Sequence, residues 1–242
     1  MPKNKMDLID DGFNARLVEN ATFAGFWEIP TIKKPDKIII PQAMIPFTKR
    51  NYSNNYNEAV MFYEHDIRFR DVLISVDRYV DELSKFSAVI SPDCSLYTDM
   101  PLVLQMVNTY LNRQIGHYLQ TKGLYVIPNV RWGDERSYKR IIPTETPFAF
   151  LGVEKHSIVS IGTYGCSKTK EELFHLREGL REMLKELEPD IVLVYGSMKE
   201  SVFRDFLDKT QFIHYSDWTS FRHGRYWYGQ WKIWKILHFT WK

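Results

Sequence analysis

Short apolar runs alternate with amphipathic helical patterns through the middle of the chain, and this alternation limits the possible folds more than any other feature. Three of the runs are Ala88–Ile90, residues 157–161 and Ile191–Tyr195. Residues 101–122 and Lys170–Leu187 instead place apolar side chains at steps of three and four positions, as an amphipathic helix does. Strands buried on both faces by flanking helices have this pattern. The sequence therefore predicts an α/β fold with a parallel sheet.

Further elements of the same kind extend the pattern in both directions. The additional predicted strands are residues 38–40, 59–63, 124–127 and 212–215, and the additional predicted helices are residues 69–86 and 200–208. Roughly seven strands that alternate with helices suit a distorted βα-barrel, which is the arrangement we expect. An open doubly wound sheet is the alternative.

The chain divides into three regions by composition. Its 242 residues fit one large domain, which we place at residues 37–216. Residues 1–36 read as an N-terminal arm, because Trp27, Pro30 and Pro35 are spaced as in an extended segment. Residues 217–242 form a basic aromatic tail.

Composition excludes some protein classes and leaves others open. No apolar run approaches the roughly 20 residues that a membrane-spanning helix needs, so no transmembrane span is expected. The first residues lack a secretory signal pattern, and the two cysteines lack CxxC spacing, so we expect a cytoplasmic protein with reduced thiols. A net charge of +2 does not by itself indicate a polyanion partner. The oligomeric state is left open.

The loops that follow the strands carry the candidate site residues. Right-handed crossovers place these loops on one rim of a parallel sheet, where ligands of α/β proteins bind. The candidate catalytic residues on this rim are Asp93, Arg131 and Thr163. The candidate ligand-binding residues are Asn129, Trp132, Gly165, Ser167, Lys168, Tyr195 and Gly196.

Two segments of this rim could bind an anion, and each has a purely structural alternative. Residues 162–168 (GTYGCSK) combine glycines, hydroxyls and a lysine before a helix, where free amides attract anions, although the P-loop spacing is absent. Their glycines would equally permit a tight turn. Arg131 and the neighbouring Trp132 could together bind a phosphate or a base. The alternative is that the indole ring is buried against the aliphatic part of the arginine side chain.

Metal binding and acid–base chemistry depend on single side chains. Asp93 follows a predicted strand, so it could be a general base, a ligand of a divalent metal or a turn-forming cap. The seven histidines have no zinc-ligand spacing, and no metal site is assigned. The cofactor remains undetermined, as does whether the protein is an enzyme.

The tail supports a different hypothesis. Aromatic rings among cations can stack bases and neutralise phosphates, as in proteins that bind single-stranded nucleic acid. The residues that would do so here are Arg222, Arg225, Trp227, Trp231 and Lys232. Burial of the rings against the domain, or contact with a membrane surface, would produce the same composition.

Four motifs resemble one known family. They are residues 89–97 (VISPDCSLY), 123–132 (GLYVIPNVRW), 161–165 (IGTYG) and 192–197 (VLVYGS). Their order and spacing are similar to those of the family called domain of unknown function 4417. The resemblance covers roughly residues 25–200 and implies a bacterial, phage or mobile-element origin, without implying an activity.

The sequence is compatible with three functions. The first is a protein that binds, and as an enzyme would transform, a phosphorylated or nucleotide-like ligand at the strand-end rim; we favour it. The second is a nucleic-acid-binding protein that uses the basic aromatic tail. The third is a protein-interaction factor in the conflict between phage and host.

Overall fold

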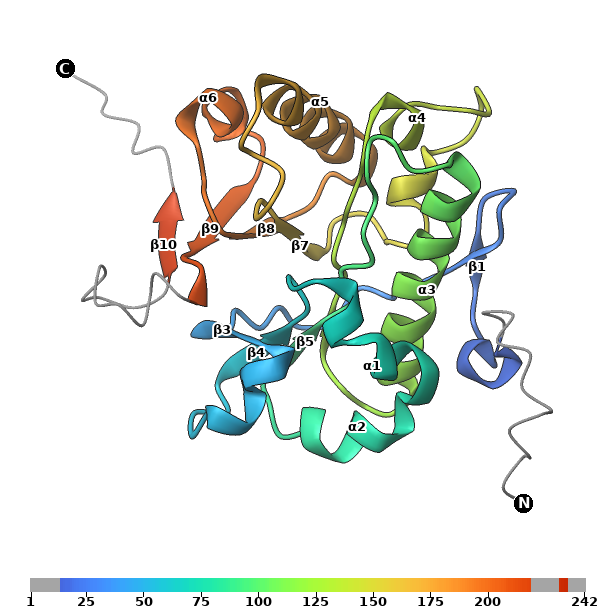
Figure 1. The fold of residues 1–242 in the computed structure, drawn as a ribbon, viewed down its shortest axis with the longest axis vertical. Helices are drawn as coiled ribbons and strands as arrows, with labels where there is room; N and C mark the ends of the chain where they lie inside the picture. Colours follow the sequence, from blue (N-terminus) through green and yellow to red (C-terminus); the bar gives the residue numbers. More distant parts are fainter. Residues whose placement is uncertain (1–13, 219–230, 235–242) are drawn as a thin grey trace.

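The computed structural model describes residues 14–218 and 231–234 of the chain (Figure 1). The strands of the first four-stranded sheet, all parallel, are β3 (Ala43–Pro46), β4 (Glu58–Met61), β5 (Ala88–Ile90) and β6 (Val126–Ile127). The strands of the second are β7 (Ile158–Gly162), β8 (Ile191–Tyr195), β9 (Gln211–Tyr215) and β10 (Trp231–Trp234), of which β10 is antiparallel to β9. A separate pair is formed by β1 (Phe23–Ala24) and β2 (Ile29–Pro30).

Helices occupy most of the connections between these strands. They are α1 (Arg70–Ser75), α2 (Asp77–Leu83), α3 (Leu102–Thr121), α4 (Glu135–Tyr138), α5 (Lys170–Leu187) and α6 (Glu200–Phe203). In Figure 1, α5 and α6 lie beside the second sheet, whereas α1, α2 and α3 lie beside the first. None of the helices in the described part of the chain is long and apolar enough to cross a membrane.

The two sheets meet where β6 passes into the loop before β7. The main-chain nitrogen of Val130 donates to the carbonyl of Ser160 at 2.8 Å, and the nitrogen of Ser160 donates to the carbonyl of Pro128 at 2.9 Å. These two hydrogen bonds form a single parallel bridge between Asn129 and Ser160. The order of the parallel strands therefore follows the order of the chain across both sheets.

Alternate residues of each strand point to opposite faces, which separates the core into layers. The inner faces share one apolar cluster that takes residues from every strand from β3 to β9. The outer faces pack on the helices: Val60 and Val89 belong to the cluster of α1 and α3, and Val192 belongs to the cluster of α5. The predicted α/β fold of parallel strands and helices is confirmed. Among the described residues the sheets do not close into a barrel, in keeping with the open-sheet alternative.

Three local predictions were wrong. Residues 38–40 are not a strand; Ile39 and Ile40 are 38% and 40% exposed, and the strand begins after Pro41, at Ala43. The predicted helix over residues 69–86 is two short helices that meet at Val76. The helix predicted over residues 200–208 ends at Phe203 and continues as a 3-10 turn.

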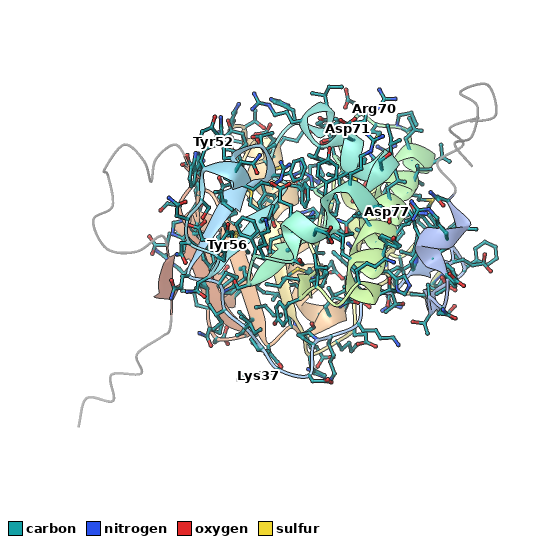
Figure 2. All side chains as sticks on the ribbon, turned by 90° about the horizontal axis from the view of Figure 1, so that it is seen from below. Lys37, Tyr52, Tyr56, Arg70, Asp71 and Asp77 are labelled. Carbon is teal, nitrogen blue, oxygen red and sulfur yellow. The ribbon has the colours of Figure 1, made fainter. Side chains whose placement is uncertain are left out.

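The first part of the described chain lies along α3. The nitrogen of Ile32 donates to the carbonyl of Gly152 at 2.9 Å, and Ile32 pairs with Val153 in an isolated parallel bridge. Arg16 forms an ion pair with Asp77 at the start of α2, at the surface (Figure 2). Arg70 and Asp71, in the first turn of α1, are exposed side chains in the same view.

Candidate functional site

A cavity of about 770 Å³ opens at the carboxyl ends of the parallel strands. Residues from the ends or following loops of β3 to β9 line it, among them Lys49, Glu64, Asp93, Arg131, Gly165 and Trp218. The rim loops therefore do meet around one hollow. Its volume lies within the roughly 300–1,000 Å³ that small-molecule sites occupy.

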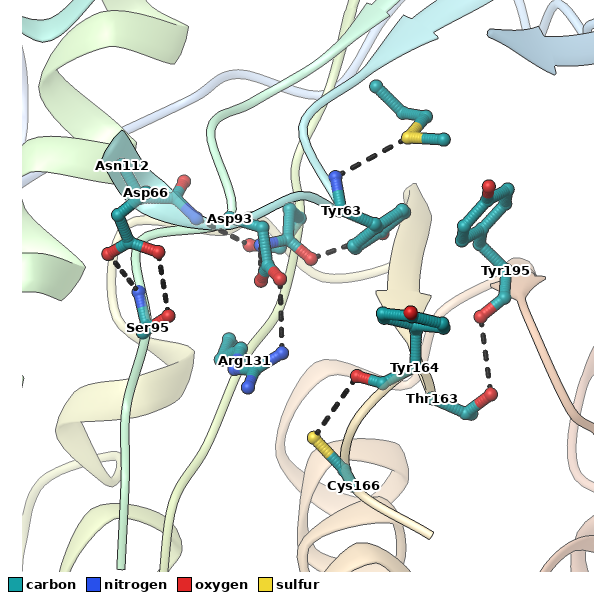
Figure 3. A network of polar contacts seen from close by, with 12 residues as sticks. Tyr63, Asp66, Asp93, Ser95, Asn112, Arg131, Thr163, Tyr164, Cys166 and Tyr195 are labelled. Atoms are coloured by element: carbon teal, nitrogen blue, oxygen red, sulfur yellow. Dashed lines mark hydrogen bonds and ion pairs between the residues drawn. The ribbon is translucent and has the colours of Figure 1, made fainter. Parts of the chain in front are cut away.

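The ion pair of Asp93 and Arg131 forms a largely buried, charged part of the cavity wall (Figure 3). Nη1 of Arg131 lies 3.0 Å from Oδ2 of Asp93, and the two side chains are 13% and 8% exposed. Burial raises the pKa of Asp93, although Arg131 and Asn129 oppose this effect. Burial alone would lower the pKa of Arg131, but the attractions of Asp93 and of further acidic neighbours, including Cys166 and Asp66, together outweigh it, so the pKa is raised. The guanidinium therefore remains charged.

Asn129 fixes the orientation of the Asp93 carboxylate from beneath the cavity. Its Nδ2 donates to Oδ1 of Asp93 at 2.8 Å, and its Oδ1 accepts a hydrogen bond from the hydroxyl of Tyr63 at 3.2 Å. Asn129 is fully buried and does not line the cavity. Its local role in the structure is to hold Asp93.

Two more candidates lie behind the cavity wall. Thr163 is fully buried, and its hydroxyl donates to the main-chain carbonyl of Tyr195 at 3.2 Å. Gly196, at φ +101°, packs against that hydroxyl so closely that a Cβ would lie 2.8 Å from Oγ1. Neither residue lines the cavity, and neither does Ser167, whose carbonyl accepts a hydrogen bond from Lys199. Trp132, Gly165, Lys168 and Tyr195 do line it.

Three amides at the start of α5 are already satisfied within the chain. Oε2 of Glu172 accepts hydrogen bonds from the nitrogens of Lys168 and Thr169 at 2.6 and 2.9 Å, and the nitrogen of Glu172 donates to Oγ1 of Thr169. This capping box occupies three of the donors that a phosphate would otherwise use. Gly165, at φ +80°, forms the tight turn before it. An anion at this rim would therefore contact side chains, such as those of Lys168 and Arg131.

Trp132 is held flat against α5. Its Nε1 donates to the carbonyl of His175 at 3.0 Å, and a Cβ at Gly179 would lie 2.1 Å from that nitrogen. Glycine is required here because the indole ring approaches the helix backbone. Trp132 is 8% exposed and lines the cavity. It therefore both packs against α5 and forms part of the cavity wall.

The two cysteines lie in different surroundings. Cys94 is buried in the cluster of α1 and α3, whereas Cys166 is half-buried and lines the cavity beside Arg131. Burial raises the pKa of both thiols. Both therefore stay protonated at neutral pH, which weakens them as nucleophiles.

Several cavity residues were given no role from the sequence. Tyr97 and Tyr164 line the mouth with side chains that are 51% and 65% exposed, and both fall inside motifs that the sequence analysis quoted. His175 also lines the cavity, from the second turn of α5. The sequence feature that could have identified His175 is its position one helical turn after Glu172, which also lines the cavity. Within residues 14–218 and 231–234, no three His, Cys, Asp or Glu side chains gather as a metal site would require.

Most of the tail lies outside the described residues, including Arg222, Arg225 and Trp227. Trp231 and Lys232 belong to β10, where they lie opposite Tyr215 and His214 of β9.

Comparisons with known proteins point to one family. A family model described as "Domain of unknown function (DUF4417)" matches residues 21–216. The chain is similar to the "Gene 1 protein" of Mycobacterium phage L5, with 30% identity over 212 residues that cover 86% of each chain. It is also 30% identical to the "Gene 1 protein" of Mycobacterium phage D29 over 150 residues, which cover 62% of this chain and 53% of that protein. No solved structure gives a significant match.

Proposed function

We propose that this chain, which belongs to the family called domain of unknown function 4417, binds a phosphorylated or nucleotide-like ligand in the cavity at its strand ends. In this proposal Arg131 and Lys168 contact the anionic group. The exposed rings of Tyr97 and Tyr164 stack on the planar part of the ligand, and Asp93 accepts a hydrogen bond or a proton from it.

The observation that carries the proposal is the state of Arg131. A guanidinium has five N–H donors, and the protein supplies few acceptors here. Nη1 donates to Asp93, Nη2 has no hydrogen-bond acceptor among the described residues, and Nε is buried without one. Buried polar groups in folded proteins are nearly always paired, so a cavity-lining arginine with a spare donor suits an anionic ligand.

A second buried cation adds to the positive charge beneath the cavity. Arg113 is 1% exposed and donates only to neutral oxygens, which are the carbonyls of Asn129, Ala149 and Leu151 and the side chain of Asn112. Burial lowers its pKa to about 9, so it remains mostly protonated at neutral pH. Two arginines and one carboxylate belong to this network: Arg131 is bonded directly to Asp93, and Arg113 is linked to it through Asn129.

The aromatic residues at the mouth favour a ligand with a flat ring. Stacking of a base on an aromatic side chain contributes about 1–3 kcal/mol per base. Tyr97 follows β5 and Tyr164 follows β7, so the two exposed rings approach the cavity from different loops. If the bound ligand is transformed, Asp93 is the group placed to take its proton, since burial has raised its pKa.

A thermal-shift screen tests the proposal. The ligands are AMP, GMP, CMP, UMP, ribose 5-phosphate, inorganic phosphate and short single-stranded DNA. A mononucleotide at about 100 times its Kd should stabilise the wild-type protein by about 2.7 kcal/mol, because only the folded state binds it. Arg131→Met should abolish this shift. Arg204→Met should keep it, because Arg204 forms an exposed surface ion pair with Glu200.

Other outcomes of the same screen favour the other functions. A shift with single-stranded DNA alone, lost in a chain that ends at Trp218, would favour nucleic-acid binding through the tail. No shift with any small ligand would contradict the proposal and leave the protein-interaction function as the stronger candidate. An equal mononucleotide shift in wild type and Arg131→Met would remove Arg131 from the site.

A further inference from the structure

We infer that His175 is a second anion-contacting group of the cavity, and that its imidazole makes ligand binding depend on pH. The inference rests on the proposed function, since it names a further residue of the same site. His175 lines the cavity from α5, and Arg131 lines it from the loop after β6.

The imidazole of His175 is held by one edge. Its Nδ1 lies 2.9 Å from the hydroxyl of Tyr138, a residue of α4 that is 1% exposed. The two ring nitrogens point in nearly opposite directions. With Nδ1 turned toward the buried Tyr138, Nε2 is turned away from it, and Nε2 has no hydrogen-bond partner within the described chain. The free edge is therefore available to a molecule in the cavity.

The surrounding backbone keeps the ring in this place. Lys168, Glu172, His175 and Leu176 all line the cavity, and from Glu172 onward these positions are one helical turn or one residue apart on α5. The carbonyl of His175 also accepts the hydrogen bond of Trp132. The histidine thus lies on a rigid helix face that is fixed at both its side chain and its main chain.

The contact with Tyr138 is compatible with both charge states of the imidazole. A tyrosine hydroxyl donates to a neutral Nδ1 and accepts from a protonated one. Protonation therefore leaves the contact in place, and it makes Nε2 a charged donor toward an anion. Burial raises the pKa of Tyr138 to about 12, so the hydroxyl itself stays protonated throughout the physiological range.

The charged groups around this pair come from α4, α5 and the loops beside them. Asp134 forms an ion pair with Arg136, Glu178 forms one with Arg181, and the carboxylate of Glu172 accepts the two amides of the capping box. The remaining charged neighbours are Glu135, Glu182 and Lys168. His65 is the other histidine that lines the cavity, from the loop after β4.

The accessibility of Nε2 can be tested without a ligand. Diethyl pyrocarbonate modifies accessible neutral imidazoles, and peptide mass mapping locates each product. We expect His175 to be modified together with the exposed His156, while His117, which is 6% exposed, stays unmodified in the folded protein. Inorganic sulfate should slow modification of His175 and leave His156 unchanged. An unreactive His175 would overturn the inference.

The pH dependence is tested with sulfate because its charge stays constant from about pH 5.5 to about pH 8. Wild type should bind sulfate about tenfold more tightly at the lower pH, as a charge-assisted hydrogen bond to a protonated imidazole predicts. His175→Gln should remove most of this pH effect. His156→Gln is the matched control, because His156 is exposed, does not line this cavity and should leave the effect in place.

The outcomes separate the two proposals. If mononucleotides bind through Arg131 and His175→Gln keeps the full pH effect, or if sulfate does not bind, only the role of His175 is wrong. If neither mononucleotides nor sulfate bind, the proposed function fails and this inference fails with it.

Discussion

Arg131→Leu is expected to lower the free energy of unfolding by about 3 kcal/mol, because it leaves the carboxylate of Asp93 buried without its counter-charge. The double variant Asp93→Asn/Arg131→Leu should recover most of this loss. Asparagine keeps an oxygen for the hydrogen bond from Asn129 and removes the charge. Urea unfolding of the wild-type protein, both single variants and the double variant measures the effect.

The stability loss of Arg131→Leu should depend on pH, because Asp93 is the group whose charge is left without a partner. Its folded-state pKa is raised by burial, and the loss of Arg131 removes the main opposing effect. A raised pKa in the folded state contributes stability that is present below the unfolded pKa of about 3.9 and is lost as the pH rises through the folded value. The loss in free energy of unfolding caused by Arg131→Leu should therefore be largest at neutral pH and become smaller on acidification. Equal losses in free energy of unfolding for Arg131→Leu and for the double variant would contradict this account of the ion pair.

Gly152→Ala should also destabilise the protein by about 3 kcal/mol. Gly152 has φ +71°, where an alanine costs about 1–2 kcal/mol, and a Cβ there would lie 2.2 Å from the main-chain oxygen of Pro30. Backbone cannot move aside as a flexible side chain can. The displaced segment would pull Ile32 from its hydrogen bond with Gly152, so residues 14–36 should become more sensitive to limited proteolysis.

Gly123→Ala is the matched control for this substitution. Gly123 has φ +82°, and no atom lies within 4 Å of a Cβ built on it. Its replacement should cost only the backbone strain, about 1 kcal/mol, and leave proteolysis of residues 14–36 unchanged. Equal losses for the two variants, measured by urea unfolding, would show that the contact with Pro30 adds nothing.

The fold could be predicted where the pattern is local and regular. The bounds of β5, β8 and α5 agree with the predicted ranges, because an apolar run or a helical period is visible within each segment. Residues 38–40 misled the prediction, since a β-branched run was taken as buried when it lies outside the sheet beside Pro41. β10 was not predicted. Its pairing with β9 is a long-range contact that no local pattern announces.

The sequence predicted where the candidate site lies, but it did not predict which side chains line the cavity or what they contact. The meeting of the rim loops follows from the strand order, and Asp93 and Arg131 do contact each other. Thr163 faces the chain interior because its hydroxyl satisfies a carbonyl of the neighbouring strand, which depends on strand register. His175 gains its significance from Tyr138, which is 37 positions earlier in the chain. A single sequence does not reveal such pairings.

The most direct test of the central claim uses the chain's two cysteines. Cys94 is 2% exposed, whereas Cys166 is half-buried, lines the cavity and lies beside Arg131. Alkylation with iodoacetamide near pH 9, which increases the thiolate fraction over neutral pH, should modify Cys166 and spare Cys94 in the folded protein.

Saturation with the mononucleotide that gives the largest thermal shift should slow alkylation of Cys166 at least about tenfold, because the occupied cavity excludes the reagent. Arg131→Met should lose this protection at the same ligand concentration. An alkylation rate for Cys166 that no mononucleotide or phosphate changes would contradict a ligand site at the strand ends.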